Sequence, residues 1–239
     1  MVSSIAVFGS SGAIGQALTH QAIQLYPEAT LYAFSRQPQS FSSSSVQAHT
    51  IDYGSEQAIE AAINLACEHF PLDKVIVATG ILHDDHAAPE KCLRDLSADN
   101  FHHLLSVNTV LPAIIAKYAL PKLNKKAPSL FAALSARVGS ISDNQLGGWY
   151  SYRVSKAALN MVIKTAAIEM ARRNQQAVVV GLHPGTVDSF LSRPFQKNVP
   201  QGKLFTPEYA AQKLLAVCAG LTADDSGKLF AWDGQEVAP

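Results

Sequence analysis

Two tyrosines, Tyr150 and Tyr152, precede one lysine, Lys156, in the stretch GGWYSYRVSKAALN of residues 147–160. An α-helix turns about 100° per residue, so Tyr152 and Lys156 lie about 40° apart on one helix face, whereas Tyr150 lies about 240° from Lys156. A lysine ammonium beside a phenol stabilises the phenolate, so the spacing predicts a lowered pKa for Tyr152. Such a phenol can exchange a proton near neutral pH. The pair is common on helices, and it indicates chemistry only in combination with other motifs.

A glycine-rich turn, VFGSSGAIGQAL (7–18), follows the first apolar run and opens the first helical pattern. Gly9 predicts a tight turn with positive φ, and the small residues Gly12 and Ala13 allow a backbone to approach a pyrophosphate. Gly15 allows the helix and the strand to pack closely, and the free N–H groups of the helix N-terminus favour phosphate. The turn therefore predicts a dinucleotide site, with an ordinary tight turn as the alternative.

The end of the second apolar run reads FSRQP, with Ser35 and Arg36 where an acidic reader of a ribose 2′-hydroxyl would stand. An arginine pairs with a 2′-phosphate, which favours NADP(H) over NAD(H). A solvated arginine is the alternative. Asp52, after the third run, is expected either to accept a hydrogen bond from an adenine amino group or to cap a turn.

Other residues are weaker candidates. HDDH (83–86) has metal-ligating residue types, but a solvated loop is favoured and no metal is predicted. His102 and His103 are expected at the surface or at an interface, and His183 is expected in a structural role, with the rim of the pocket as the alternative. The segment 183–205 lacks a clear helical or strand periodicity and is expected to be a substrate or lid loop. It contains three aromatic residues that are expected to form either an apolar lid or scattered packing contacts: Phe190, Phe195 and Phe205.

Apolar, β-rich runs alternate with helical patterns along the chain. Strands are expected at 5–9, 30–35, 46–51, 73–80, 129–134, 177–182 and 228–232. Helices are expected at 13–26, 55–70, about 99–123, about 150–172 and 206–220, with Ser55, Ser97 and Thr206 as N-caps. Buried strands that alternate with helices predict one doubly wound α/β domain over residues 1–239, with about seven parallel strands and helices on both faces.

Composition narrows the class of protein. The chain has 19 basic and 19 acidic residues and no basic run, so nucleic acid and anionic membranes are not expected partners. The three cysteines, Cys67, Cys92 and Cys218, are far apart and indicate a reducing compartment. No signal peptide or membrane-spanning stretch is expected, and a cytoplasmic location is predicted.

Three motifs in order, FGSSGAIG with Phe8 in place of the usual threonine, YRVSK (152–156) and HPGTVDS (183–189), resemble the short-chain dehydrogenase/reductase family. The resemblance covers nearly the whole chain, and SARVGSISDN with GGWYSYRVSKAALN is most similar to C-factor-like and carbonyl-reductase-like members. It implies a Rossmann-type fold and assembly into homodimers or homotetramers.

The resemblance also implies roles. Tyr152 would be the acid–base, Lys156 would bind the nicotinamide ribose, and Asn108 would position a proton-relay water. The serine that polarises the substrate carbonyl usually stands where this chain has Ala136. Ser135 is favoured as its replacement, with Ser140 and Ser142 left open.

The cofactor set implied by the family includes VATG (77–80), which lacks the usual asparagines, and PGTVDS (184–189), which has serine for threonine. The expected cofactor-binding residues are Gly9, Ser11, Gly12, Ala13, Ile14, Gly15, Ser35, Arg36, Asp52, Tyr53, Ala78, Gly80, Lys156, Pro184, Gly185, Val187 and Ser189. The expected reaction is NADP(H)-dependent reduction of an apolar or aromatic aldehyde or ketone, or its reverse. The alternative is an NADP(H)-binding signalling or redox-sensing protein without catalysis.

Overall fold

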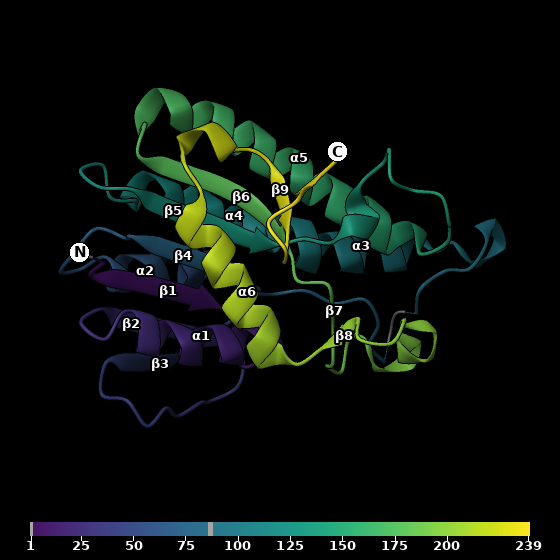
Figure 1. The fold of residues 1–239 in the computed structure, drawn as a ribbon, viewed down its shortest axis with the longest axis horizontal. Coiled ribbons are helices and arrows are strands. Elements are labelled where there is room, and N and C mark those ends of the chain that lie inside the picture. Colours follow the sequence, from purple (N-terminus) through teal and green to yellow (C-terminus); the bar gives the residue numbers. More distant parts are fainter. Residues whose placement is uncertain (1, 86–87) are drawn as a thin grey trace.

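Eight strands form one sheet in the order β10-β9-β6-β5-β4-β1-β2-β3 (Figure 1). The structure is a computed structural model that describes residues 2–85 and 88–239. The strands of this sheet are β1 (Ser4–Phe8), β2 (Thr30–Ser35), β3 (Val46–Thr50), β4 (Lys74–Val77), β5 (Ser129–Leu134), β6 (Ala177–His183), β9 (Leu229–Ala231) and β10 (Glu236–Val237). The first seven are parallel, as the sequence predicts. The strand count corrects the expectation, because β10 adds an eighth strand, antiparallel to β9.

In the part of the chain that the structure describes, six α-helices cover the two faces of the sheet. They are α1 (Ala13–Leu25), α2 (Glu56–Ala66), α3 (Ala98–Leu105), α4 (Leu111–Ala119), α5 (Tyr150–Arg173) and α6 (Pro207–Gly220). Buried side chains of α1 and α6 form one apolar cluster with the sheet, and those of α2, α4 and α5 form another on the opposite face. The predicted N-caps are confirmed: the side-chain oxygens of Ser55, Ser97 and Thr206 each accept a hydrogen bond from the first turn of α2, α3 and α6.

The strand order reverses between β1 and β4, because the chain leaves β1 towards β2 and later returns to place β4 on the other side. The loops after β1 and β4 diverge at this point, which opens a crevice at the carboxyl ends of the strands. The glycine-rich turn follows β1 and the VATG segment includes the end of β4, so both motifs lie at the crevice.

The predicted long helix is interrupted. Residues 98–122 are helical, but Ser106–Val110 forms a π-helical turn between α3 and α4. By length and composition this run is apolar enough to cross a membrane, contrary to the sequence-based expectation. Its buried residues, such as Leu104, Leu111 and Ile115, pack inside the fold, and core helices of soluble proteins also have this composition.

Residues 183–205 form an excursion beyond β6. Two short strands, β7 (Thr186–Val187) and β8 (Leu204–Phe205), pair in parallel and close its base, and the 3-10 helix η5 (Arg193–Asn198) lies between them. Asp188 N also donates to Phe205 O at 2.8 Å. In Figure 1 this excursion projects beyond the carboxyl ends of the central strands.

Candidate active site

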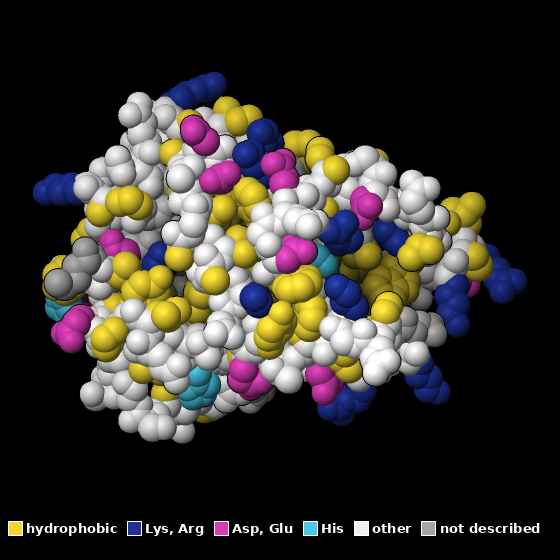
Figure 2. Space-filling model, viewed as in Figure 1, with side chains coloured by type: hydrophobic (Ala, Val, Ile, Leu, Met, Phe, Trp, Pro, Cys, Tyr) yellow, Lys and Arg dark blue, Asp and Glu magenta, His cyan; other side chains and the backbone are white. Residues whose placement is uncertain are grey.

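A cavity of about 280 Å³ lies at the carboxyl ends of β4, β5 and β6, under the 183–205 excursion. In Figure 2 a hollow with hydrophobic side chains deep inside it opens beside the β7–β8 region. Ten of the predicted site residues line the cavity together: Ile14, Ala78, Gly80, Ser135, Tyr152, Lys156, Pro184, Gly185, Val187 and Ser189. The sequence motifs, which are up to 175 residues apart (14 to 189), therefore meet at one place.

Tyr152 and Lys156 share the wall of the cavity that α5 provides. The Lys156 Nζ lies 5.9 Å from the centroid of the Tyr152 ring, so the two groups are neighbours on one helix face, as the spacing predicts. The Lys156 ammonium donates to Leu134 O at 2.9 Å, at the end of β5. Tyr152 packs against Leu82, Leu104 and Ala136 in a small apolar cluster.

The direction of the Tyr152 pKa differs from the expectation. Burial raises the pKa of Tyr152, because the surrounding apolar side chains disfavour the phenolate. Burial also lowers the pKa of Lys156 to about 8, which weakens its effect as a cation on the phenol. In the protein alone, the phenol is therefore held protonated, which suits a proton donor.

Asn108 joins the loop after β4 to α5. Its Oδ1 accepts from Ile81 N at 2.9 Å, and its Nδ2 donates to Ile81 O at 2.9 Å and to Ser155 Oγ at 3.0 Å. A Cβ atom at Gly80 would lie 3.4 Å from both Asn108 Oδ1 and Lys156 Nζ. Asn108 thus holds the Gly80 loop close to Lys156, and the π-helical turn is the element that presents it.

Ser135 is buried in the cavity wall and donates its hydroxyl proton to Asn160 Oδ1 at 2.6 Å. Asn160 lies one helical turn beyond Lys156 on α5. A hydroxyl has one proton, so Ser135 polarises a carbonyl only when that proton turns from Asn160 into the cavity. Ala136, which also lines the cavity, has no hydroxyl to offer.

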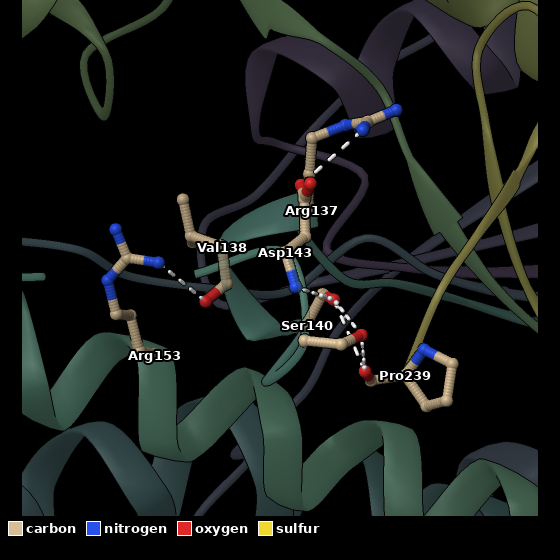
Figure 3. Close-up of polar contacts among 7 residues, drawn as sticks. Arg137, Val138, Ser140, Asp143, Arg153 and Pro239 are labelled. Carbon is tan, nitrogen blue, oxygen red and sulfur yellow. Dashed lines mark hydrogen bonds and ion pairs between the residues drawn. The ribbon is translucent and has the colours of Figure 1, made fainter. Parts of the chain in front are cut away.

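Ser140 and Ser142 lie apart from the cavity wall. Their hydroxyls donate to the carbonyl oxygen of Pro239, at 3.4 and 2.5 Å (Figure 3). In the same close-up Arg137 pairs with Asp143 on the other side of this loop. These two serines therefore fasten residue 239 to the loop after β5, and Ser135 is the member of the three that faces the cavity.

The glycine turn fits a dinucleotide phosphate. Gly9 has φ +84°, and a Cβ atom at Gly15 would lie 2.1 Å from Gly9 O, so both positions require glycine. The N-cap residue of α1, Gly12, makes no side-chain capping bond, and the first turn carries no acid. Ser11 and Gly12 are exposed and Ala13 is half-buried; Gly12 N donates to Gly9 O at 3.1 Å, so an anion would use the N–H groups that follow it in the first turn of α1.

The residues predicted to bind the adenosine end lie outside the cavity wall. Arg36 is exposed at the end of β2, while the buried Ser35 donates its hydroxyl to Gln37 O. The Asp52 carboxylate accepts from Gly54 N at 2.8 Å, which is the turn role that the sequence left open. The Tyr53 hydroxyl donates to Phe34 O at 2.8 Å and accepts from Gly9 N at 2.7 Å, so it braces the glycine turn.

Apolar side chains form the rest of the cavity. Of the three phenylalanines proposed for a lid, Phe195 lines the cavity and packs against Trp149, with ring centroids 4.9 Å apart. Phe190 is 69% exposed, and Phe205 packs against Trp232, so these two match the packing alternative. Other apolar residues of the wall are Leu82, Leu134, Val138, Leu191 and Val199.

Two of the described histidines, His83 and His103, are not part of the cavity wall, and a third, His183, lines the cavity. His83 Nε2 lies 3.2 Å from the carbonyl oxygens of Phe190 and of Leu191 and donates to them, and so holds the excursion. His103 pairs with Asp84 at the surface. His86 lies outside the described residues, and within residues 2–85 and 88–239 no group of three His, Cys, Asp or Glu side chains could hold a metal. His183 lines the cavity, and its pKa falls to about 4, mainly through burial and then through Arg137.

Several residues of the site escaped sequence reasoning. Trp149 and Thr79 line the cavity, and Asn160 orients Ser135. Their only signal in the sequence is proximity to a motif: Thr79 lies inside VATG, Trp149 precedes the Tyr152 helix, and Asn160 follows Lys156 by four residues. Helical spacing could have placed Asn160 on the face of Tyr152 and Lys156.

Comparisons with known proteins identify the family and the fold. The family model described as enoyl-(acyl carrier protein) reductase matches residues 26–232. A 1-hydroxy-2-glutathionyl-2-methyl-3-butene dehydrogenase from Rhodococcus sp. is 31% identical over 185 residues, which cover 77% of this chain and 76% of that protein. The C-signal of Myxococcus xanthus is 32% identical over 145 residues, covering 61% of this chain and 82% of the relative.

Solved structures show the same fold. The carbonyl reductase Sniffer of D. melanogaster superposes with a TM-score of 0.86 at 21% identity, with all of both chains covered. The NADPH-bound carbonyl reductase from chicken fatty liver gives a TM-score of 0.86 at 22% identity, covering 100% of this chain and 99% of that one. From the matched family model and the Rhodococcus relative, we conclude that this chain belongs to the short-chain dehydrogenase/reductase family of oxidoreductases.

Proposed function

We propose that this protein reduces the carbonyl group of an apolar or aromatic aldehyde or ketone, or oxidises the corresponding alcohol, with NADP(H) as the cofactor. The observation that carries the proposal is the placement of Tyr152 and Lys156 in one wall of an apolar cavity that begins beside the glycine turn. The cofactor, when bound, supplies or accepts the hydride.

The chain itself supplies the proton. Tyr152 is buried and protonated, and its hydroxyl is the proton donor for the oxygen of the reduced carbonyl. Lys156, fixed by Leu134 O, would hold the nicotinamide ribose and, in its charged form, would favour the phenolate after proton transfer. Ser135 is proposed to polarise the carbonyl once its proton leaves Asn160.

The preference for NADP(H) rests on Arg36. This side chain is exposed at the end of β2, where a 2′-phosphate on the adenosine ribose would be within reach of a guanidinium. Residues 35 and 36 are not acidic, so this position lacks the carboxylate that usually accepts a hydrogen bond from the free ribose 2′-hydroxyl of NAD(H). The NADPH-bound carbonyl reductase from chicken fatty liver, which has the same fold, is consistent with this preference.

The apolar wall indicates the substrate class. Trp149, Phe195 and Leu191 face the same cavity as the Tyr152 hydroxyl. An aromatic or branched aliphatic group would bury apolar surface there, and aromatic rings would pack against Trp149 and Phe195.

A panel assay tests the proposal. NADPH oxidation should be measured with aromatic aldehydes, aliphatic ketones, quinones and small polar carbonyl compounds such as pyruvate. We expect the highest kcat/KM with the aromatic and branched apolar compounds. No turnover with any member, despite NADPH binding by calorimetry, would contradict the catalytic proposal.

A second function, NADP(H) binding without catalysis, has one specific observation in its favour. Ala136 replaces the usual serine, and the neighbouring hydroxyl of Ser135 is donated to Asn160 rather than to the cavity. Such a protein would act as a signalling or redox-sensing protein. Binding of NADPH with no turnover across the panel would favour it.

A further inference from the structure

The helix that carries Tyr152 begins without a cap of its own. Its N-cap residue, Trp149, has φ +53° and makes no side-chain capping bond. The two preceding residues, Gly147 and Gly148, also have positive φ, at +65° and +66°. A non-glycine residue in this conformation is strained, so other parts of the structure must hold it in place.

Glu90, from the loop before α3, supplies the missing cap. Its backbone oxygen accepts from Trp149 N at 2.6 Å. Its carboxylate accepts from Ser151 N at 3.2 Å through Oε2 and from Ser151 Oγ at 2.5 Å through Oε1. Glu90 therefore binds the residues on either side of Tyr150, the first residue of α5: its backbone oxygen binds Trp149, and its carboxylate binds Ser151.

Asn100 completes the network from α3, which packs beside the N-terminal end of α5 (Figure 1). Its Nδ2 donates to Glu90 Oε1 at 2.5 Å and to Ser151 Oγ at 3.0 Å. Glu90 is only 2% exposed, and the donors that contact its carboxylate are an amide, a hydroxyl and a backbone N–H. Among the residues that the structure describes, no cation is recorded in contact with this carboxylate; its burial is therefore costly, and the N-terminal end of the helix dipole partly offsets that cost.

The network lies next to the reacting side chain. Tyr152 follows Ser151 directly, and Trp149 packs against the Tyr152 ring with centroids 6.2 Å apart. Both rings line the cavity. Further along α5, Leu159 and Ile163 are buried in the main core, which holds the later turns of the helix independently of Glu90.

We infer that Glu90 is a positioning residue: its buried carboxylate, through Ser151 and Asn100, sets the place of the first turn of α5 and thereby of the Tyr152 hydroxyl and the Trp149 wall. This inference rests on the proposed carbonyl chemistry for its kinetic consequence. Its structural consequence, the environment of Trp149, is independent of catalysis.

Glu90→Gln keeps the size of the side chain and replaces one acceptor oxygen by a donor that faces Ser151 or Asn100. We expect kcat on the best substrate of the panel to fall more than tenfold, with KM and the NADPH dissociation constant changed less than threefold. The NADPH affinity of Glu90→Gln should stay close to that of the wild type, because Lys156 and the glycine turn do not contact Glu90. Ser151→Ala should reproduce the fall in kcat in part.

Asp73→Asn is the matched control. Asp73 is also buried, accepts from two backbone N–H groups, of Ser3 and Ser4, and from Asn124 Nδ2, but it lies at the opposite end of β4 from the cavity. Its isosteric substitution should lower the free energy of unfolding without changing kcat. An equal fall in kcat for both variants would overturn the inference, because general loosening would then explain it.

Trp149 fluorescence separates the inference from the proposed reaction. The chain has two tryptophans, so in a Trp232→Phe background the emission comes from Trp149 alone. Glu90→Gln should shift this emission to longer wavelength and increase quenching by acrylamide, and Asp73→Asn should not. If the wild-type protein turns over nothing, the proposed reaction fails and the emission shift alone decides the inference. Unchanged emission with unchanged kcat, or a parallel loss of NADPH affinity, would overturn it.

Discussion

The Tyr152 end and the glycine-turn end of the site are built from different parts of the chain. At the Tyr152 end, the predicted catalytic groups are buried side chains from α5 and from the residue after β5; Lys156 is held by Leu134 O and Ser135 by Asn160, while the Tyr152 ring packs in an apolar cluster. At the glycine-turn end, the expected ligands are exposed backbone groups and one exposed arginine. The difference teaches that changes at the first end should alter turnover, whereas changes at the second should alter cofactor affinity.

The largest effect is expected from Tyr152→Phe. The substitution removes the proton donor but keeps the ring against Trp149, so kcat should fall about 10³-fold, within the range for loss of a general acid. NADPH affinity, measured by fluorescence titration, should stay nearly unchanged. Tyr150→Phe is the matched control and should have little effect. Equal losses in the two variants would contradict the assignment of Tyr152 by helix face.

Ser135→Ala should lower kcat by about 10²-fold if Ser135 polarises the carbonyl, since that is the usual cost of removing one such donor. Ser140→Ala should leave kcat near the wild-type value, because Ser140 binds Pro239 instead of facing the cavity. The steady-state rates of both variants with the best panel substrate check this. A larger loss for Ser140→Ala would move the polarising role away from Ser135.

Gly15→Ala tests the glycine-turn end of the site. The added Cβ atom would meet Gly9 O at 2.1 Å, so the turn must shift, at a cost of about 2 kcal/mol in the free energy of unfolding. NADPH affinity should fall with it. At Gly12 the added Cβ would be 3.4 Å from Gly9 O, so Gly12→Ala should spare stability and weaken NADPH binding only. Urea unfolding and calorimetric titration of the two variants distinguish a packing role from a phosphate-binding role.

The burial of Lys156 predicts a pH dependence of stability. Its pKa is lowered from 10.5 to about 8, so between these values the unfolded chain binds more protons than the folded protein and stability rises with pH. From pH 7.5 to 9.5 the gain should be about 2 kcal/mol. Above about pH 10, the raised pKa of Tyr152 acts in the opposite direction. The free energy of unfolding in urea should be measured against pH for the cofactor-free protein and for Lys156→Met. Equal slopes of the two curves would refute the contribution of Lys156.

Arg36→Ala should give the smallest effect. NADPH affinity should fall about tenfold, equivalent to about 1.4 kcal/mol, while NADH affinity stays the same, because only NADPH carries the 2′-phosphate. Parallel titrations with the two cofactors measure the ratio. An unchanged ratio would remove Arg36 from the site and leave the cofactor preference without a residue to explain it.

Much of the architecture could be predicted from the sequence. The alternation of buried strands and helices gave the parallel sheet, because both patterns are local. The strand β10 was not predicted, because it has only two residues, which are too few to show an alternation of apolar and polar side chains. The π-helical turn at Ser106–Val110 was also missed, since it interrupts an apolar pattern that continues through it.

The site was predictable where a motif is contiguous and unpredictable where it is assembled by folding. Tyr152 and Lys156 lie as helical spacing requires, but the predicted direction of the Tyr152 pKa was wrong, because burial of the phenol raises it. Glu90 lies 61 residues from its partner Ser151, and no local rule connects them. The cytoplasmic location and the homodimeric or homotetrameric assembly stay predictions.

The wide turn of Ser106–Val110 also constrains how this chain can change by insertion or deletion. A π turn contains one residue more than an α turn. Losing one residue there would restore an even helix but rotate everything before it by about 100°, so α3 and the amide of Asn108 could not both keep their partners. We therefore expect a substitution in this segment to be less disruptive than a change in its length, because only the latter changes the register of α3.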